Sequence, residues 1–385
     1  PAVIFQCRGV ADVKAALGAA RAAGVAVAVR SQGHGADGAS AGVDGGAVID
    51  LSHDRAVFVD VATKTAKLSG GCTLGDLDLE AAAHDLAAVH GVVAQTGVGL
   101  YLHGGVGYLQ HRYGLAVDQV LGAQVVLADG TVVEARGDND HAELFYALRG
   151  AGSSFGIVTR LDLQLYDTPR MVGGFFGCCV DSGDDEADVA VAVAAMQLAR
   201  DALEREEAAG ERRTFGMVML NRLPPGHPQA GKRAICFSVG AIVDDGFDES
   251  AALKLLKPFV DFAEAHGGVV IGAVPAVTTF VKFNLTFKPL IASLPPDIKT
   301  YWRGFLMRKA NDDFLKAAAM TWHRRPMCAA PSFFAFELHG GGAGAVHGKR
   351  VATGGGKYDD HCVASLRDGL FSVGLLASIW VKKTR

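Results

Sequence analysis

The hydrophobic and polar residues of the first thirty positions follow a strand pattern, then a helix pattern, then a strand pattern. Residues 2–5 are AVIF, and residues 25–30 are VAVAVR. Between them, within residues 11–23, apolar side chains recur at helical spacing at Val13, Ala16, Leu17 and Ala20. The chain is therefore predicted to begin with a strand, a helix and a second strand.

Shorter alternating segments follow at residues 47–51, 56–61 and 65–71, and each is typical of a strand. A helix is predicted near residues 74–88, with Thr73 as its N-terminal cap. Residues 123–135, AQVVLADGTVVEA, predict a hairpin in which Asp129 and Gly130 supply the positive φ angles of a tight turn. The first half of the chain is thus expected to mix helices and strands.

The pattern changes after residue 168. A long helix is predicted at about 184–209 and shorter ones at 250–265 and 312–322, and strands are predicted at 215–220, 234–243, 332–338 and 370–381. A chain of 385 residues is long enough for two domains. We expect an α+β protein with domains at 1–168 and 169–385, the second built on an antiparallel sheet flanked by helices.

Composition and charge exclude several classes. Half of the residues are hydrophobic, yet no apolar run approaches the ~20 residues of a membrane span, so no membrane partner is expected. The net charge is -4 and no basic stripe carries interleaved aromatics, which argues against nucleic acid. The seven cysteines form no CxxC pair, so no metal site is predicted. One glycosylation sequon, at Asn284, lies in what the pattern predicts to be a strand.

Three glycine-rich segments of the first half have the character of a nucleotide site. They are residues 29–35 (VRSQGHG), 96–118 (TGVGLYLHGGVGYLQHRYGLAVD) and 148–159 (LRGAGSSFGIVT). Glycines let a backbone approach a ligand closely, although any one segment alone could be a tight turn. No G-x-G-x-x-G follows the first strand, which argues against NAD. A histidine in a loop is usually a surface residue, so the pattern alone leaves the role of His34 open.

These motifs resemble those of FAD-linked oxidoreductases of the vanillyl-alcohol oxidase and berberine-bridge-enzyme group. In that group an RSGGH loop carries a histidine joined covalently to the flavin, and here the loop is RSQGH, with Gln32 in place of a glycine. The resemblance extends through residues 102–135, 142–159, 301–314 and 333–341, and the spelling is closest to glucooligosaccharide and chitooligosaccharide oxidases. It implies a two-lobed FAD-binding fold of the PCMH type.

The resemblance implies FAD as cofactor, held by the first domain. Some relatives add a second tether from the cysteine of an HGTC motif, but here the motif is HGVV and Val93 stands at that position, so a single covalent link through His34 is expected. The segment TGVGLYLHGG is expected to be shorter than in the relatives. The cofactor-binding residues that the resemblance implies are Arg30, Ser31, Gln32, Gly33, His34, Gly35, Val93, Thr96, Gly97, Val98, Gly104, Gly105, Gly107, Asp118, Gly152, Gly156, Ile157 and Val158.

Glu337 is the candidate catalytic base. In FFAFELHGG it stands where relatives have an acidic residue, and strand alternation places it on one face with Phe333 and Ala335. We expect it to face the cleft between the lobes, with Phe333, Ala335 and Tyr301 contacting substrate, although an exposed strand-end carboxylate is an equal alternative. Relatives place a polar residue at Gly374, and they continue to an NY segment that bears a catalytic tyrosine, which we expect the second domain to lack.

The function that the resemblance implies is oxidation of an alcohol or hemiacetal CH–OH group of a carbohydrate, with oxygen or another electron acceptor. Two alternatives stay open: a catalytically impaired flavoprotein-like binding protein, and a flavin oxidase of a secondary metabolite. The resemblance favours a secreted protein, with a cytoplasmic location as the alternative.

Overall fold

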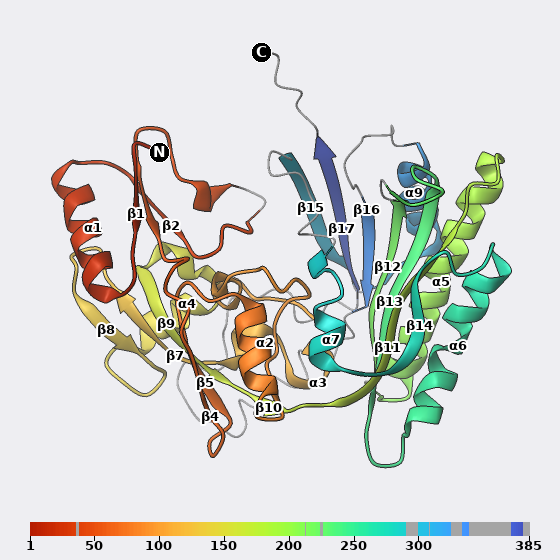
Figure 1. The fold of residues 1–385 in the computed structure, drawn as a ribbon, viewed down its shortest axis with the longest axis horizontal. Coiled ribbons are helices and arrows are strands. Elements are labelled where there is room, and N and C mark those ends of the chain that lie inside the picture. The colour runs from red at the N-terminus through yellow and green to blue at the C-terminus, as the bar shows by residue number, and fades with distance from the viewer. Residues whose placement is uncertain are drawn as a thin grey trace. The chain divides into compact units, whose positions relative to one another are not determined.

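The fold consists of two compact units (Figure 1). The computed structural model describes residues 1–35, 38–211, 213–223, 226–289, 299–307, 309–324, 333–338 and 371–379. The first unit contains Pro1–Thr168, and the second begins at Pro169 and includes the described strands up to residue 379. The α+β class with antiparallel sheets is as predicted.

The predicted strand, helix and strand open the first unit. They are β1 (Val3–Gln6), α1 (Val10–Ala22) and β2 (Val27–Arg30). Strand β3 (Ala47–Asp50) lies between β1 and β2 and runs parallel to both. Helix α1 buries Val13 and Leu17 in one cluster with Ile49 of β3, and this packing fixes where β2 ends and its loop begins.

A five-stranded antiparallel sheet forms the rest of the first unit, in the order β4-β5-β9-β7-β8. Its strands are β4 (Val57–Asp60), β5 (Thr65–Ser69), β7 (Val120–Val126), β8 (Val132–Ala135) and β9 (Ile157–Gln164). The helical and remaining strand elements around it are η1 (Ala39–Ala41), α2 (Leu74–Ala82), β6 (Leu86–Ala87), η2 (Val98–Leu102), α3 (Gln110–Tyr113), η3 (Ala116–Gln119), α4 (Ala142–Ala151), η4 (Gly152–Ser154) and β10 (Tyr166–Asp167).

Two local predictions in this unit are wrong. The helix predicted to reach residue 88 ends at Ala82, because Asp85 adopts a left-handed φ of 56° and the next residues form β6, which pairs with β10. In the β7–β8 hairpin only Gly130 has a positive φ, of 90°. Asp129 instead accepts a hydrogen bond from the Thr131 backbone at 2.8 Å, so the connection is longer than a two-residue turn.

The second unit is a seven-stranded antiparallel sheet in the order β14-β11-β13-β12-β16-β17-β15. Its strands are β11 (Arg170–Cys179), β12 (Thr214–Arg222), β13 (Arg233–Val243), β14 (Ile271–Thr279), β15 (Lys299–Met307), β16 (Phe333–Leu338) and β17 (Phe371–Ile379). Helices α5 (Asp185–Ala208), α6 (Glu249–Ala265) and α9 (Asp312–His323) cover one face, where their apolar side chains share a core with the sheet (Figure 1).

The sequon prediction is also wrong. Residues 280–284 form a short helix, α7 (Phe280–Asn284), which begins where the Thr279 hydroxyl accepts a hydrogen bond from the Lys282 backbone. The Asn284 side chain is buried, with 1% of its surface exposed. A strand is excluded, and an asparagine buried in this way cannot carry a glycan in the folded protein.

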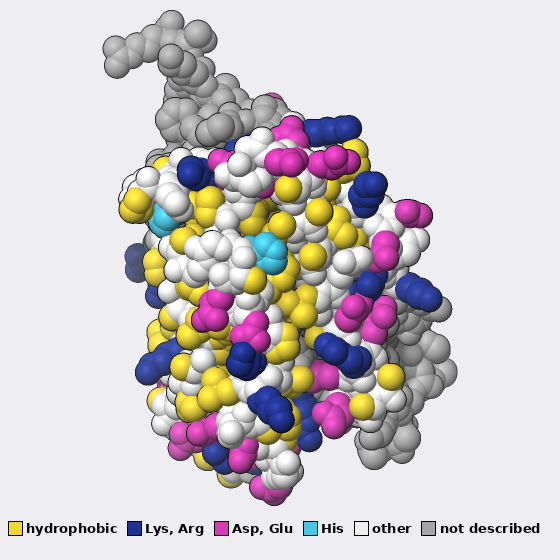
Figure 2. Space-filling view, turned by 90° about the vertical axis from the view of Figure 1, so that its right-hand side faces the viewer, with side chains coloured by type: hydrophobic (Ala, Val, Ile, Leu, Met, Phe, Trp, Pro, Cys, Tyr) yellow, Lys and Arg dark blue, Asp and Glu magenta, His cyan; other side chains and the backbone are white. Residues whose placement is uncertain are grey.

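The face of the second unit that carries α5 and α6 shows acidic and basic side chains interspersed with small apolar areas (Figure 2). No single-sign field covers this face, which agrees with the small net charge of -4. Among the described residues, none of the helices combines the length and the apolar character that a bilayer crossing requires.

Candidate functional site

The loop that follows β2 is tied down by its own side chains. The Gln32 side-chain amide donates hydrogen bonds to the carbonyl oxygens of Gly71 and, at 3.4 Å, of Ser52. Gly33 turns the loop with a φ of 72°, a conformation that a side chain at this position would strain. The replacement of a glycine by Gln32 therefore supplies an anchor between the loop and the strands beside it.

The second glycine segment lies directly against this loop. A Cβ atom added to Gly97 would stand 2.5 Å from the Ser31 hydroxyl and 2.9 Å from the Gln32 backbone nitrogen. The segment is fixed at the start of α2, where the Leu74 backbone donates to the carbonyl of Thr96 at 2.9 Å. Thr73 and Asp76 cap the same helix end reciprocally, as predicted for Thr73. Ser31 and Gly97, which are 66 residues apart in the chain, are thus brought together.

The third segment reaches the loop through a glycine pair that sequence reasoning missed. The Gly70 backbone donates to the carbonyl of Thr159 at 2.8 Å, and Gly71 accepts the bond from Gln32. A Cβ at Gly71 would stand 1.7 Å from the Leu51 carbonyl oxygen, so only glycine fits. The two consecutive glycines after β5 are visible in the sequence. Their importance could not be read from it, because it depends on contacts with the segments of Gln32 and Thr159.

The remaining predicted glycines pack the same region tightly. Gly105 has a φ of 74° and faces Ala116, and its carbonyl accepts from the Ala116 backbone at 3.0 Å. A Cβ at Gly152 would meet the Leu102 side chain at 2.7 Å. A Cβ added to Gly107 would likewise clash with the His90 carbonyl oxygen, and one added to Gly156 would clash with the Val125 side chain. The Gly104 carbonyl accepts a hydrogen bond from the Val117 backbone.

Several predicted cofactor residues point elsewhere. The side chains of Val98 and Val158 belong to one hydrophobic core of the first unit and that of Ile157 to another, so only their backbone groups are available to a ligand. Asp118 accepts from the Leu115 backbone at 2.9 Å and thereby caps η3. Val93 is half-buried, and a valine side chain has no group that forms a thioether.

His34 and Ser31 are the two side chains of the loop with chemistry to offer. Although solvent reaches His34, desolvation by the surrounding protein lowers the pKa of its imidazole, against a smaller opposite effect of a hydrogen bond to its own backbone. A neutral ring keeps the lone pair that a covalent bond to carbon needs. The Ser31 hydroxyl is buried and has no hydrogen-bond partner among the described residues.

These features fit a nucleotide cofactor. A buried hydroxyl is normally hydrogen-bonded, and Ser31 lies where Gly97 leaves space that a Cβ would fill. Beside it, Gly33 and Gly35 expose backbone that can approach a phosphate closely. The same loop carries Arg30, whose guanidinium forms an ion pair with Asp50 at 3.8 Å.

A buried ion pair that the sequence gave no reason to expect lies beneath this region. His90 Nε2 is 2.8 Å from an oxygen of Asp78 and its Nδ1 is 2.9 Å from the Gly91 carbonyl, and both side chains are fully buried. With a carboxylate and a carbonyl as partners, the doubly protonated ring satisfies both contacts. Burial alone would lower the pKa of His90, but the charge of Asp78 and the two hydrogen bonds outweigh it and raise that pKa.

Glu337 lies in the second unit, on β16 between β12 and β17, opposite Met217 and Ser372. The other strand face carries Phe334, Phe336 and Leu338, which are buried in the core with the helices. Glu337 is half-buried and therefore belongs to the sheet face away from α5 and α9, together with Phe333 and Ala335. The alternation predicted for this strand is present.

The other predicted substrate residues can be placed only in part. Gly374 of β17 pairs with Ala335 and Gly304, so the strand has no side chain at the position where relatives carry a polar one. The backbone of Tyr301 belongs to β15, but its side chain lies outside the described residues. No cluster of metal-ligating side chains occurs in the part of the chain that the structure describes.

The comparisons with known proteins define the class. Residues 1–136 match the family model of the FAD binding domain. The fold is that of FAD-linked oxidoreductases related to vanillyl-alcohol oxidase and berberine bridge enzyme, as the motifs predicted. Residues 1–136 of the first unit therefore resemble an FAD binding domain.

The particular relatives differ in their substrates. The (R)-6-hydroxynicotine oxidase of Paenarthrobacter nicotinovorans is 44% identical over 177 residues, which are 46% of this chain and 38% of that enzyme. The crystal structure of 6-hydroxy-D-nicotine oxidase from Arthrobacter nicotinovorans has a TM-score of 0.76 at 26% identity, covering 97% of this chain and 74% of that one. Glucooligosaccharide oxidase from Acremonium strictum, which has a 6-S-cysteinyl, 8α-N1-histidyl FAD, has a TM-score of 0.71 at 21% identity, covering 97% and 73%. The chain spans less than half the length of the curated relatives it matches.

Proposed function

We propose that this protein is an FAD-dependent oxidoreductase that oxidises an alcohol or hemiacetal CH–OH group, with a carbohydrate as the substrate class. The observation that carries the proposal is the convergence of the two other glycine segments, 96–118 and 148–159, on the Ser31–His34 loop, with the Ser31 hydroxyl buried beside Gly97. The match of residues 1–136 to the FAD binding domain supports the same cofactor.

In this proposal the first unit holds the cofactor. The loop from Arg30 to Gly35 and the segment from Gly152 to Val158 bind the adenine and pyrophosphate through backbone groups, and His34 provides the single covalent link. When bound, FAD supplies the acceptor for the hydride that leaves the substrate carbon. The neutral state of the His34 ring suits the tether, because a protonated nitrogen has no lone pair to form it.

The second unit provides the proton acceptor. Glu337 accepts the proton of the substrate hydroxyl as the hydride departs, so that an aldehyde, ketone or lactone is formed without a high-energy alkoxide. Phe333 and Ala335 share its strand face and line the approach of the substrate, with Phe333 available to stack on a sugar ring. Oxygen or another acceptor then takes up the electrons.

A second candidate substrate class is a hydroxylated pyridine alkaloid. It is favoured by the 44% identity with an enzyme named (R)-6-hydroxynicotine oxidase over 177 residues, which exceeds the identity to the named oligosaccharide oxidases. The match extends over 46% of this chain and 38% of that enzyme, which does not fix the substrate, so we keep carbohydrate as the first candidate.

One experiment separates the candidates. The oxidised flavoprotein is mixed without oxygen with cellobiose, with a chitooligosaccharide or with 6-hydroxynicotine, and loss of the flavin absorbance reports reduction. We expect reduction by a saccharide. Reduction by 6-hydroxynicotine alone would transfer the proposal to the alkaloid class, and no reduction by any of them would favour the binding-protein alternative.

The role of Glu337 is tested in the same assay. Glu337→Gln should slow flavin reduction by roughly 10²–10⁴-fold, as loss of a general base does, while the flavin content stays unchanged. The exposed helix residue Glu264, changed to Gln, serves as the control and should leave the rate as it is. A Glu337→Gln protein that reduces its flavin at the wild-type rate removes this residue from the mechanism.

A further inference from the structure

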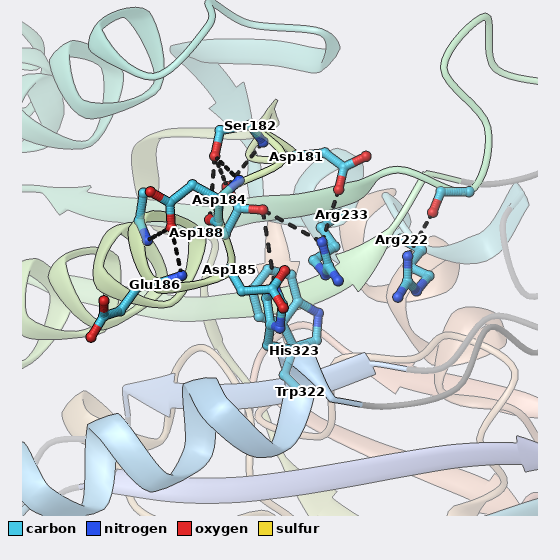
Figure 3. Close-up of polar contacts among 12 residues, drawn as sticks. Asp181, Ser182, Asp184, Asp185, Glu186, Asp188, Arg222, Arg233, Trp322 and His323 are labelled. Carbon is cyan, nitrogen blue, oxygen red and sulfur yellow. Dashed lines mark hydrogen bonds and ion pairs between the residues drawn. The ribbon is translucent and has the colours of Figure 1, made fainter.

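A charged pocket lies beside the hairpin that joins β12 and β13, and Figure 3 shows several of the side chains that line it. Its volume is ≈ 570 Å³, and it lies beside the turn between β12 and β13 and the end of α9. Its charged lining consists of Asp181, Arg222, Lys232, Arg233, His323 and Arg324. Four of these lining side chains are Arg or Lys and one is a carboxylate, so cations outnumber carboxylates on the lining itself, while Asp185 and Asp188 lie behind it.

The hairpin of β12 and β13 carries several cations close together, which does not favour the stability of the sheet. Arg222 and Arg233 are directly opposite each other on β12 and β13, and Lys232 precedes Arg233 in the chain. Like charges at opposed positions of an antiparallel pair destabilise the sheet. The Arg222 guanidinium donates to the Gly231 carbonyl at 2.9 Å, and this bond orients the side chain.

The charge of Arg233 is partly neutralised by two carboxylates. It forms ion pairs with Asp181 at 2.9 Å and with Asp188 at 3.4 Å (Figure 3). Asp188 is buried and also accepts hydrogen bonds from the Ser182 backbone and hydroxyl, at 3.0 and 2.7 Å. These contacts orient Arg233.

Lys232 and Arg324 are exposed, and within the described part of the chain neither forms an ion pair. A cation at the C-terminal end of a helix is stabilised by the helix dipole, which accounts for Arg324 at the end of α9. The dipole gives no reason for the three cations of the hairpin. Their gathering around one concave surface is what an anionic ligand requires.

His323 lies at the floor of the pocket. Its side chain is 6% exposed, and its Nε2 is 3.4 Å from an oxygen of Asp185 and 4.0 Å from one of Asp188. The contact joins the end of α9 to the start of α5. The cations therefore stand on the hairpin and at the end of α9, and these elements share one hydrophobic core with α5.

We propose that this pocket binds the phosphoryl group of a small phosphorylated molecule. Guanidinium groups match a phosphate oxygen pair by planar, charge-assisted hydrogen bonds, and a lysine adds a point charge. The volume exceeds that of a phosphate alone and leaves room for the organic part of the ligand. The site is independent of the oxidation proposed above.

Calorimetric titration tests the site with inorganic pyrophosphate as the probe, on the full chain saturated with FAD so that the nucleotide site of the first unit is unavailable. At constant ionic strength we expect binding that weakens as salt is raised. Lys232→Gln combined with Arg324→Gln should weaken it at least tenfold. These two exposed residues are not part of the proposed cofactor or catalytic groups, so flavin content and flavin reduction should stay at wild-type values.

The matched control is Lys254→Gln combined with Lys257→Gln, which removes the same charge from the exposed side of α6. Its affinity for pyrophosphate should stay within twofold of wild type. Absence of pyrophosphate binding at millimolar concentration overturns the proposal, as does equal weakening by both double variants. Succinate is titrated in parallel, and binding as tight as that of pyrophosphate overturns the assignment to a phosphoryl group.

Discussion

His34 is the residue that decides whether the cofactor is covalently held. It ends a loop fixed by Gln32, and its lowered pKa keeps the ring neutral near pH 7. We predict that acid precipitation leaves the yellow colour with the wild-type protein and that His34→Ala releases it. His53→Ala, at an exposed histidine of the same unit, should keep the colour in the pellet. A colourless wild-type pellet from a flavin-loaded preparation would contradict the tether.

The buried pair of His90 and Asp78 predicts a pH dependence of stability. The folded pKa of His90 is raised above its unfolded value of about 6.5. The stabilisation by this group is then fully present below about pH 6.5 and is lost as the pH rises through the higher folded value. Urea unfolding between pH 5.5 and 9 should show the advantage of wild type over His90→Gln at its largest at the acidic end.

The size of this effect follows from burial. Removing one partner leaves Asp78 buried and uncompensated, which costs about 3–5 kcal/mol. The exposed pair of His84 and Glu80, whose Nε2 and Oε1 atoms are 4.0 Å apart, provides the comparison. Because solvent screens this pair, His84→Gln should change the free energy of unfolding by less than about 1 kcal/mol. If both substitutions cost the same at every pH, His90 is not protonated in the folded protein.

At the scale of elements, the contact between the loop after β2 and the segment before η2 is open to a direct test. Gly97→Ala places a methyl group 2.5 Å from the Ser31 hydroxyl and must displace the loop, whereas Gly99→Ala meets nothing within 4 Å. Neither glycine has a left-handed φ, so the two variants differ chiefly in this contact. We expect Gly97→Ala to lower the fraction of protein with bound flavin severalfold and Gly99→Ala to leave it unchanged.

Absorbance at the flavin band divided by that at 280 nm measures this fraction for each purified variant. Thermal unfolding is recorded beside it, since a fold that is lost entirely would also lose flavin. Equal flavin content in the two variants, both folded, would mean that the loop does not need its present position to hold the cofactor.

Elements whose signal lies within one stretch of sequence were predictable. Helices α5 and α6 start and end within one residue of the expected ranges, because their apolar spacing and the caps at Asp184 and Asp248 are local. The end of α2 was not predictable, because it depends on the pairing of β6 with a strand that lies about 80 residues further on. Local pattern also gave no sign that Asn284 is buried in a helix.

The candidate site was predictable where a motif carries it and not elsewhere. The loop of Ser31–His34 and the later glycine segments could be identified from their resemblance to a family. The Gly70–Gly71 turn and the pair of Asp78 and His90 could not, since each acquires its role from residues brought close by the fold. Nor does the sequence distinguish glycines that face a ligand from those that only let two backbones pack.

At the scale of the whole molecule, the two units should respond differently to the cofactor. A ligand that binds one unit stabilises that unit by mass action, by about 2.7 kcal/mol when its concentration is 100 times its dissociation constant. We predict that FAD added to flavin-free His34→Ala protein slows amide hydrogen exchange at residues 31–35, 70–71, 96–98 and 152–158. Exchange in α5, α6 and α9 should stay unchanged.

Hydrogen exchange measured by mass spectrometry resolves these segments. A thermal scan of the same sample should show only the transition of the first unit moving to higher temperature. Protection confined to the second unit would show that the domain division at residue 168 misplaces the cofactor.

The strand order of the second unit has a consequence for how the protein is made. Strand β12 pairs on one side with β13, which is close in sequence, and on its other side with β16, which is distant in sequence. A ribosome that adds ~5–20 residues per second completes β16 on the order of ten seconds after β12. Until then one edge of β12 presents unpaired backbone N–H and C=O groups beside its apolar side chains. Such an edge can pair with a strand of another chain. The nascent protein therefore needs either a chaperone to shield that edge or a low local concentration of its own copies while translation is completed.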